Sequence, residues 1–137
     1  SKLEISTRET GGSLTLALTV DEKGYTKPKA LAPTVQAPSF SATPTINPAL
    51  GNTWDMTLTG NVTAATVSAG YDGQKLTLRL KQDGTGSKTW AFDSSVAFGT
   101  DITGITLSTA ANKTDLIGLE YNAAATKWWA VAFTKGF

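Results

Sequence analysis

The most constraining feature of the chain is a strictly alternating segment at 73–82, Gly-Gln-Lys-Leu-Thr-Leu-Arg-Leu-Lys-Gln. Leucines stand at 76, 78 and 80, and polar or charged residues stand between them. Successive side chains of a strand point to opposite faces of the sheet, so a period of two gives one apolar and one polar face. The segment therefore predicts a β-strand in a sheet that is buried on one side and wetted on the other.

Further amphipathic segments follow one another through the C-terminal part, with turn residues between them. We expect strands at 53–59, 62–68, 74–82, 88–92, 102–107, 115–121 and 127–134. The glycines of 83–87 predict a hairpin loop, and 122–126 predicts a second hairpin between the last two strands. Strands spaced about ten residues apart are typical of an all-β fold, either an antiparallel β-sandwich or a small barrel.

The N-terminal part has a different texture. Two strand candidates, 2–7 and 13–20, precede a tract that holds all five prolines, at 28, 33, 38, 44 and 48. Proline lacks a backbone donor and biases the preceding residue toward extended conformations, so the tract can form neither a helix nor a central strand. We therefore expect N-terminal strands at 1–24, a Pro-rich extended arm or linker at 25–51, and a β-sandwich domain at 52–137.

An extended arm with few internal hydrogen bonds must lie on another surface to be ordered. It can wrap on its own domain, or it can dock on a neighbouring subunit. In the second case the capsid- or subunit-contacting residues are expected to be Tyr25, Lys27, Pro28, Leu31, Pro33, Val35, Pro38 and Phe40.

The tryptophans have the most apolar area to bury, and core or interface packing is the common fate of such residues. In 127–134, alternation predicts Trp129, Val131 and Phe133 on one face, and Trp128 with two alanines on the other. Trp128 is therefore our candidate for an exposed or subunit-contacting tryptophan. An exposed tryptophan on a β-sandwich can stack on a sugar ring, so Trp128 is also the candidate for glycan stacking.

The residue types exclude much chemistry. The chain has no histidine and no cysteine, which removes the usual general base, the Ser-His triads, thiolate catalysis and the commonest metal ligands. Asp72, Asp83 and Asp101 stand beside glycine or at strand ends, where such side chains cap turns. We expect no catalytic residue, no metal site, no cofactor and no enzymatic activity.

Charge and hydropathy exclude two classes of partner. The net charge is +1, and the one cationic row, Lys75, Arg79 and Lys81, fits the solvated face of a strand. Nucleic-acid binding is therefore not expected. No run approaches the roughly 20 apolar residues of a membrane span, so no membrane partner is expected.

Four blocks resemble small β domains in virion structural proteins of tailed bacteriophages. They are 57–63 (Thr-Leu-Thr-Gly-Asn-Val-Thr), 73–78 (Gly-Gln-Lys-Leu-Thr-Leu), 80–87 (Leu-Lys-Gln-Asp-Gly-Thr-Gly-Ser) and 121–128 (Tyr-Asn-Ala-Ala-Ala-Thr-Lys-Trp). Domains of this group include capsid decoration, head-fibre, tail-fibre and receptor-binding tip types. The resemblance implies a non-enzymatic virion component that forms a homo-oligomer, commonly a trimer.

The position on the particle is argued from the pattern of the whole chain. The sequence has no coiled-coil heptads and no repeats, which a long fibre shaft would need. A compact β domain with an extended arm favours a capsid decoration (cement) protein, whose partners are the major capsid protein or other virion proteins. The alternative is a tail- or head-fibre-associated protein that attaches to the host surface or its glycans. A carbohydrate-binding module is a third hypothesis.

Overall fold

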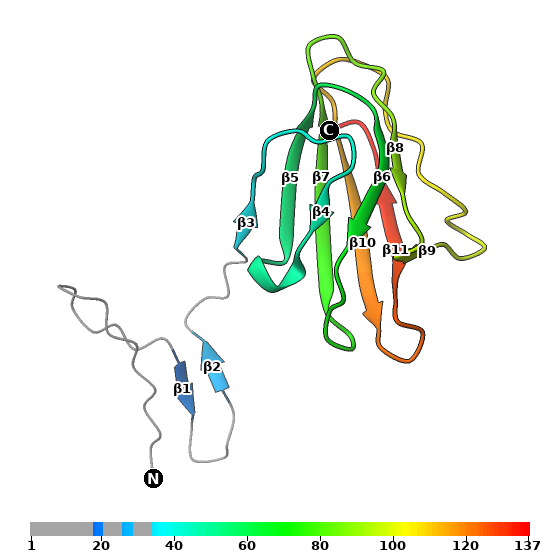
Figure 1. Ribbon diagram of the computed structural model, residues 1–137. Coiled ribbons are helices and arrows are strands. Elements are labelled where there is room, and N and C mark those ends of the chain that lie inside the picture. The colour runs from blue at the N-terminus through cyan, green and yellow to red at the C-terminus, as the bar shows by residue number, and fades with distance from the viewer. Residues whose placement is uncertain (1–17, 21–25, 29–33) are drawn as a thin grey trace, which may run out of the picture. The chain divides into compact units, whose positions relative to one another are not determined.

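The computed structural model describes residues 18–20, 26–28 and 34–137 (Figure 1). The chain divides into two compact units, Ser1–Ala32 and Pro33–Phe137. In the first unit, β1 (Leu18–Val20) pairs antiparallel with β2 (Thr26–Pro28). The expected strand at 2–7 lies outside the described residues, and only the last three residues of the one expected at 13–20 are described, as β1.

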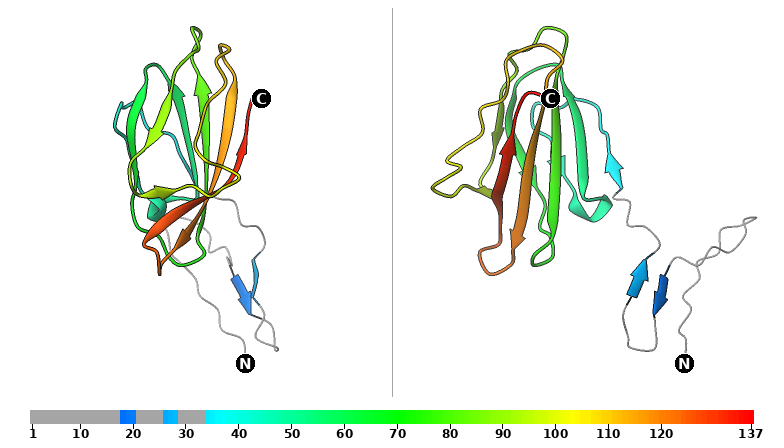
Figure 2. Two further views of the ribbon diagram at one scale, coloured as in Figure 1. Left: turned by 90° about the vertical axis from the view of Figure 1, so that its right-hand side faces the viewer. Right: turned by 180° about the vertical axis from the view of Figure 1, so that it is seen from behind.

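The second unit is a β-sandwich. Its larger sheet has the strand order β3-β5-β7-β10-β11-β9, and its smaller sheet has the order β4-β6-β8. The large-sheet strands are β3 (Val35–Gln36), β5 (Thr53–Leu58), β7 (Lys75–Gln82), β9 (Val96–Ala97), β10 (Thr114–Asn122) and β11 (Lys127–Thr134). The small-sheet strands are β4 (Thr45–Ile46), β6 (Val62–Val67) and β8 (Trp90–Phe92). Figure 2 shows the two sheets as separate layers, and no closed barrel forms in the described part of the chain. The expected all-β fold is confirmed.

Strand pairing is mixed, because the chain crosses between the sheets at each step from β5 to β8. β5 and β7 belong to the larger sheet, whereas β6 and β8 belong to the smaller one. Strands two steps apart therefore run in the same direction, and β5 pairs parallel with β7, as β6 does with β8. The antiparallel pairs are β7 with β10 and β10 with β11.

This crossing also decides the outcome for the two expected hairpins. The connection at 83–87 joins β7 in one sheet to β8 in the other, so the prediction of a hairpin there is wrong. Turn chemistry alone does not tell a hairpin from a crossing between sheets. The second hairpin is confirmed, because Asn122 pairs with Lys127 across the 123–126 turn.

Most of the expected strands are present, as β5, β6, β7, β8, β10 and β11. The strand expected at 102–107 is absent: these residues form an irregular segment between β9 and β10. Its apolar residues nevertheless serve the core, because Leu107 is buried and Ile105 packs against the buried cluster. The spacing of the apolar residues at 102–107 therefore correctly indicated that some of them are buried, but it wrongly indicated a paired strand.

The core lies between the two sheets. As alternation predicts, Leu76, Leu78 and Leu80 of β7 are all buried. Aromatic contacts join the layers: the rings of Trp54 in β5 and Trp90 in β8 are 5.8 Å apart and meet edge to face. Each large apolar side chain removed from water in this way stabilises the fold by about 1.5–3 kcal/mol.

The second half of the Pro-rich tract is part of this unit. β4 pairs parallel with β6, and Ile46 is fully buried. Pro48 begins the 3-10 turn η1 (Pro48–Leu50), and the Asn47 side chain caps it by accepting a hydrogen bond from the Ala49 backbone N–H. Residues 34–50 thus lie on their own domain, while the remainder of the tract, apart from the backbone of β2, falls outside the described residues.

Candidate functional site

The adjacent tryptophans of β11 point to opposite sides of the larger sheet. Trp128 is 1% exposed. Its indole N–H donates to the Ser68 carbonyl at 2.8 Å, and its ring lies 5.2 Å from that of Tyr121. Trp129 is 44% exposed. The expectation that Trp128 is the exposed tryptophan is therefore wrong, and Trp129 is the one that faces solvent.

A β-bulge explains why alternation misplaced Phe133. The pairing of β11 with β10 shifts register, so that Gly118 pairs with Ala132 but Leu119 pairs with Ala130. Val131 is the extra residue, and a bulge of this kind reverses which side chains point inward. Phe133 consequently packs against the core, although strict alternation placed it on the same face as Trp129 and Val131.

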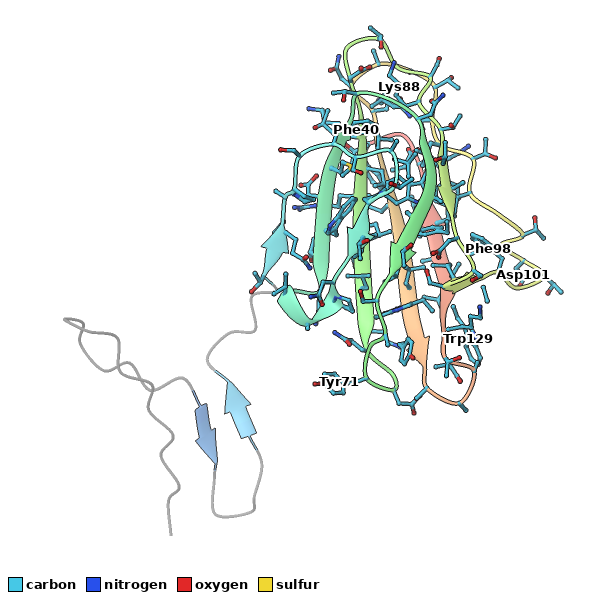
Figure 3. All side chains as sticks on the ribbon, viewed as in Figure 1. Phe40, Tyr71, Lys88, Phe98, Asp101 and Trp129 are labelled. Atoms are coloured by element: carbon cyan, nitrogen blue, oxygen red, sulfur yellow. The ribbon has the colours of Figure 1, made fainter. Side chains whose placement is uncertain are left out.

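Trp129 borders a hollow of about 330 Å³ at the edge of the sheet. We name this region the Trp129 surface, and its residues are Ala97, Phe98, Gly99, Trp129, Ala130 and Val131. Val131 is 52% exposed, and Phe98 is partly buried against Phe92, with ring centroids 6.3 Å apart. Figure 3 shows Phe98 and Trp129 on the same edge of the domain. Hollows of this size lie at the lower end of the range for small-ligand sites.

Charged side chains lie beside the exposed indole. Trp129 pairs with Glu120 of β10, and Glu120 pairs in turn with Lys75 of β7. Directly opposite residues of an antiparallel pair project from the same face, so the indole, carboxylate and ammonium form one row across three strands. Lys75 and Glu120 form an ion pair in which both side chains remain partly exposed. Because both side chains are partly exposed, each can form further hydrogen bonds with a ligand beside this ion pair.

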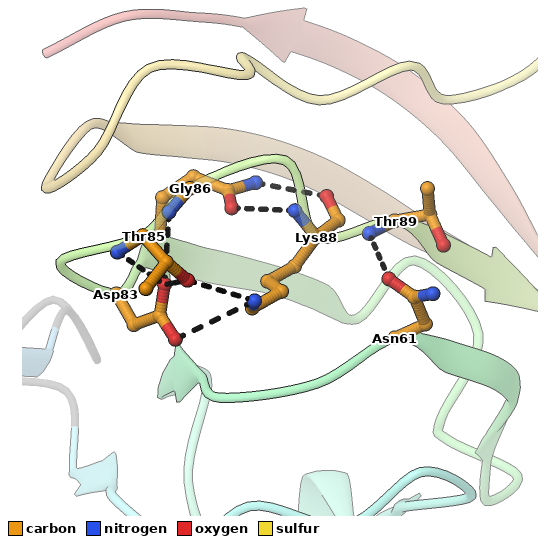
Figure 4. Close-up of polar contacts among 7 residues, drawn as sticks. Asn61, Asp83, Thr85, Gly86, Lys88 and Thr89 are labelled. Atoms are coloured by element: carbon orange, nitrogen blue, oxygen red, sulfur yellow. Dashed lines mark hydrogen bonds and ion pairs between the residues drawn. The ribbon is translucent and has the colours of Figure 1, made fainter.

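A second polar cluster lies in the loop that follows β7 (Figure 4). The Asp83 carboxylate accepts hydrogen bonds from the Thr85 hydroxyl at 2.7 Å and from the backbone N–H groups of Thr85 and Gly86, each at 2.9 Å. These bonds, first of all that of the Thr85 hydroxyl, lower the pKa of Asp83 below its ordinary value, and Lys88 at 3.7 Å adds to the effect. The Gln82 side-chain amide both donates to and accepts from the Lys88 backbone. The polar groups of this loop are therefore used to fix its own shape.

Two further carboxylates also have structural partners. Buried Asp115 accepts hydrogen bonds from the Ser108 N–H and hydroxyl, at 2.6 and 2.7 Å, and from the Gly136 N–H at 2.9 Å. Hydrogen bonds from Ser95 and Thr66 lower the pKa of Asp93. Within the described residues, no group of three acidic, histidine or cysteine side chains is placed to hold a metal ion.

Turn capping by aspartate is confirmed at two of the three expected positions. Asp83 caps its own loop, as described, and Asp72 accepts a hydrogen bond from the Ala123 backbone N–H at 2.9 Å. Asp101 is exposed in the segment after β9 (Figure 3).

Of the other predicted contact residues, the structure describes the side chains of three, Val35, Pro38 and Phe40. Val35 is exposed at the start of the domain, and Pro38 and Phe40 line an open hollow beside β5. Tyr25, Leu31 and Pro33 lie outside the described residues, and Lys27 and Pro28 are described only as backbone of β2.

Sequence reasoning missed the exposed aromatic residues. Tyr71, in the turn between β6 and β7, is 81% exposed. Its neighbours Gly70, Asp72 and Gly73 are a turn signal, and an aromatic residue in such a turn indicates exposure. Trp129 had no comparable signal, because alternation within β11 does not tell which of its two faces is buried.

No helix among the described residues has the length and hydrophobicity to cross a membrane. The searches for similar curated proteins and solved structures found no match. A family model described as "Putative phage tail fibre C-terminal domain" matches residues 42–125. That match runs from just before β4 into the β10–β11 turn and covers more than half of the chain. The chain is therefore a bacteriophage virion structural protein that belongs to this family of tail fibre C-terminal domains.

Proposed function

We propose that this chain is a tail-fibre domain that attaches the phage particle to the surface of its host bacterium. The observation that carries the proposal is the family match over residues 42–125. It favours the tail-fibre alternative over the capsid decoration protein that the whole-chain pattern first favoured. Non-enzymatic action is part of the proposal, because adhesion requires a stable surface and no reactive group.

The placement of the Pro-rich tract supports the same choice. A cement protein of the kind first considered would spread its arm across neighbouring capsid subunits. Residues 34–50 instead lie on their own domain, with Ile46 fully buried. The backbone of those residues is therefore already bound to this domain and is not free to extend as an arm across a neighbouring capsid subunit.

The outer surface of the domain is suited to adhesion. Internal hydrogen bonds fix the loop that follows β7, and the strands hold Trp129 between β10 and β9. A rigid aromatic side chain loses little conformational entropy when it binds a partner, which is why aromatic residues are common at contact surfaces. We expect the other partners of the chain to be virion proteins and further copies of itself, as a homotrimer.

Two experiments test the proposal. Purified chain, incubated with the bacterium on which the phage grows, should bind the cells and slow the adsorption of phage added afterwards. Gold-labelled antibody against residues 34–137 should mark tail fibres and leave the heads unmarked. Bacterial mutants that resist adsorption are the control, since the chain should not bind them. Absence of cell binding by the folded chain, or labelling of heads alone, would refute the proposal.

A further inference from the structure

We infer that the Trp129 surface binds a single neutral sugar ring of a cell-surface glycan, with the apolar face of the ring against the indole. This inference rests on the proposed function, and it specifies the chemical class of the ligand and the place where it binds.

The position of Trp129 is unusual among the tryptophans of this chain. Trp54, Trp90 and Trp128 are each at most 5% exposed, whereas Trp129 is 44% exposed. It lies within a strand that is paired on both sides at this point, with Glu120 opposite in β10 and Ala97 opposite in β9. The structure therefore presents a fixed, flat apolar ring to solvent.

The surroundings of the indole offer apolar contact for the C–H face of a sugar ring and polar groups for its hydroxyls. Phe98 and Val131 widen the apolar contact, and the hollow of about 330 Å³ accommodates a small ligand. Glu120 lies one strand away, about 5 Å across the sheet, and Lys75 lies one strand further. A ring stacked on Trp129 can direct its hydroxyls toward this acceptor and this donor. Because the two charges compensate each other, the site favours a neutral ligand over an anionic one.

The exposed apolar area argues against a second copy of the chain on this surface. A stable interface buries about 800 Å² on each partner. A tryptophan offers about 250 Å², so the exposed part of Trp129 is only about 110 Å², and Val131 is the one other large apolar side chain exposed on this surface. The charged row at Lys75 and Glu120 limits the apolar region on one side. An area of this size suits one ring better than a subunit.

Tryptophan fluorescence gives a direct test, because Trp129 is the one tryptophan that a quencher reaches readily. Acrylamide quenching is measured with and without neutral methyl glycosides of common bacterial hexoses and N-acetylhexosamines, at concentrations on the order of 10 mM. Saturation-transfer NMR on the same mixtures identifies the sugar protons that contact the protein. At least one glycoside should protect Trp129 from quenching and show transfer to the C–H groups of one ring face.

Three variants connect the binding to the site. Trp129→Ala should weaken binding by about tenfold or more, measured by NMR titration. Trp129→Phe keeps an aromatic ring, so it should retain most of the affinity while it removes the quenchable fluorescence. Tyr71→Ala is the matched control, because it removes another exposed aromatic side chain from a different part of the domain, and it should leave sugar binding unchanged.

Each contrary outcome overturns the inference. It fails if no glycoside of the panel shows saturation transfer, if Trp129→Ala binds as tightly as the parent chain, or if Trp129→Ala turns an oligomer into a monomer without affecting sugar binding. These outcomes are distinct from failure of the proposed function. A chain that adheres to host cells equally well with Trp129→Ala would refute the sugar site alone, whereas a chain that binds the sugar but not the cells would refute host attachment alone.

Discussion

Replacement of each of the two adjacent tryptophans of β11 by alanine should lower stability by very different amounts. Trp128→Ala removes a side chain that is 1% exposed, whereas Trp129→Ala removes one that is 44% exposed. The two residues share a strand, a hairpin and a residue type. Any difference between the variants therefore reports their environments and not the chemistry of the substitution.

The expected loss for Trp128→Ala follows from its contacts. Deletion of a buried aromatic side chain costs about 3–5 kcal/mol, because apolar contact is lost and a cavity remains. The Ser68 carbonyl also loses the indole N–H at 2.8 Å, which adds about 1 kcal/mol. Gly70 closes the site so tightly that a β-carbon there would lie 2.7 Å from the indole, so Gly70 belongs to the wall of the new cavity. We expect a total loss of about 4–6 kcal/mol, against about 1 kcal/mol or less for Trp129→Ala.

Urea unfolding followed by tryptophan fluorescence measures both variants, since all four tryptophans lie in the unit Pro33–Phe137. In a domain of this size, Trp128→Ala should lower the melting temperature by at least about 15 °C. Trp128→Phe keeps much of the volume but not the hydrogen bond, so it should fall between the parent chain and the alanine variant. Equal losses for Trp128→Ala and Trp129→Ala, or a loss below about 1.5 kcal/mol for Trp128→Ala, would refute the assigned orientation of β11.

Three further predictions concern the loops and carboxylates. Asp115→Ala removes a buried carboxylate and leaves the N–H groups of Ser108 and Gly136 without this acceptor, so it should cost about 3–5 kcal/mol in urea unfolding. Asp101→Ala, at an exposed position, should change stability by less than about 0.5 kcal/mol. Gly86→Ala places a β-carbon 2.3 Å from a backbone carbonyl oxygen, at a φ of +70°, and should cost about 2–3 kcal/mol of stability. The β-carbon of Gly84→Ala meets no atom within 4 Å, so this variant should be nearly as stable as the parent chain. Equal losses for the two variants would contradict the loop geometry. The pKa of Asp93 is lower in the folded state than in the unfolded state, where it is near 3.8. The ionised Asp93 carboxylate therefore stabilises the fold fully at a pH above 3.8, and this stabilisation is lost as the pH falls through the folded-state pKa. Asp93→Asn should therefore lose less stability than the parent chain on acidification from about pH 5 to pH 2, and parallel acid-denaturation curves would argue against it.

The sequence predicted the parts of the fold that depend on local alternation. The leucines of β7 all face the core, and the hairpin between β10 and β11 lies where the turn residues placed it. The errors arose where the path depends on contacts distant in sequence. Whether the loop after β7 returns to the same sheet or crosses to the other depends on which sheet offers β8 a partner, and β8 pairs with β6. Similarly, Ile105 and Leu107 cover the core from an irregular segment, which a period of two does not distinguish from a strand.

The candidate site illustrates the same limit more sharply. Alternation placed Trp129, Val131 and Phe133 on one face, and the preference for buried large residues then selected that face for the core. The bulge at Val131 breaks this set, because it allows Phe133 to pack inward while Trp129 and Val131 remain outside. Gly118 accommodates the displaced strand: a β-carbon there would lie 3.1 Å from the Ala132 side chain and 3.7 Å from that of Val131. The bulge thus keeps Phe133 in the core and confines the exposed apolar side chains of this part of β11 to Trp129 and Val131, and bulges are common where a side chain is directed toward a ligand. Regular pairing continued from the hairpin would leave Val131 on the outer face and bring Phe133 out beside it, so the core would lose the Phe133 side chain.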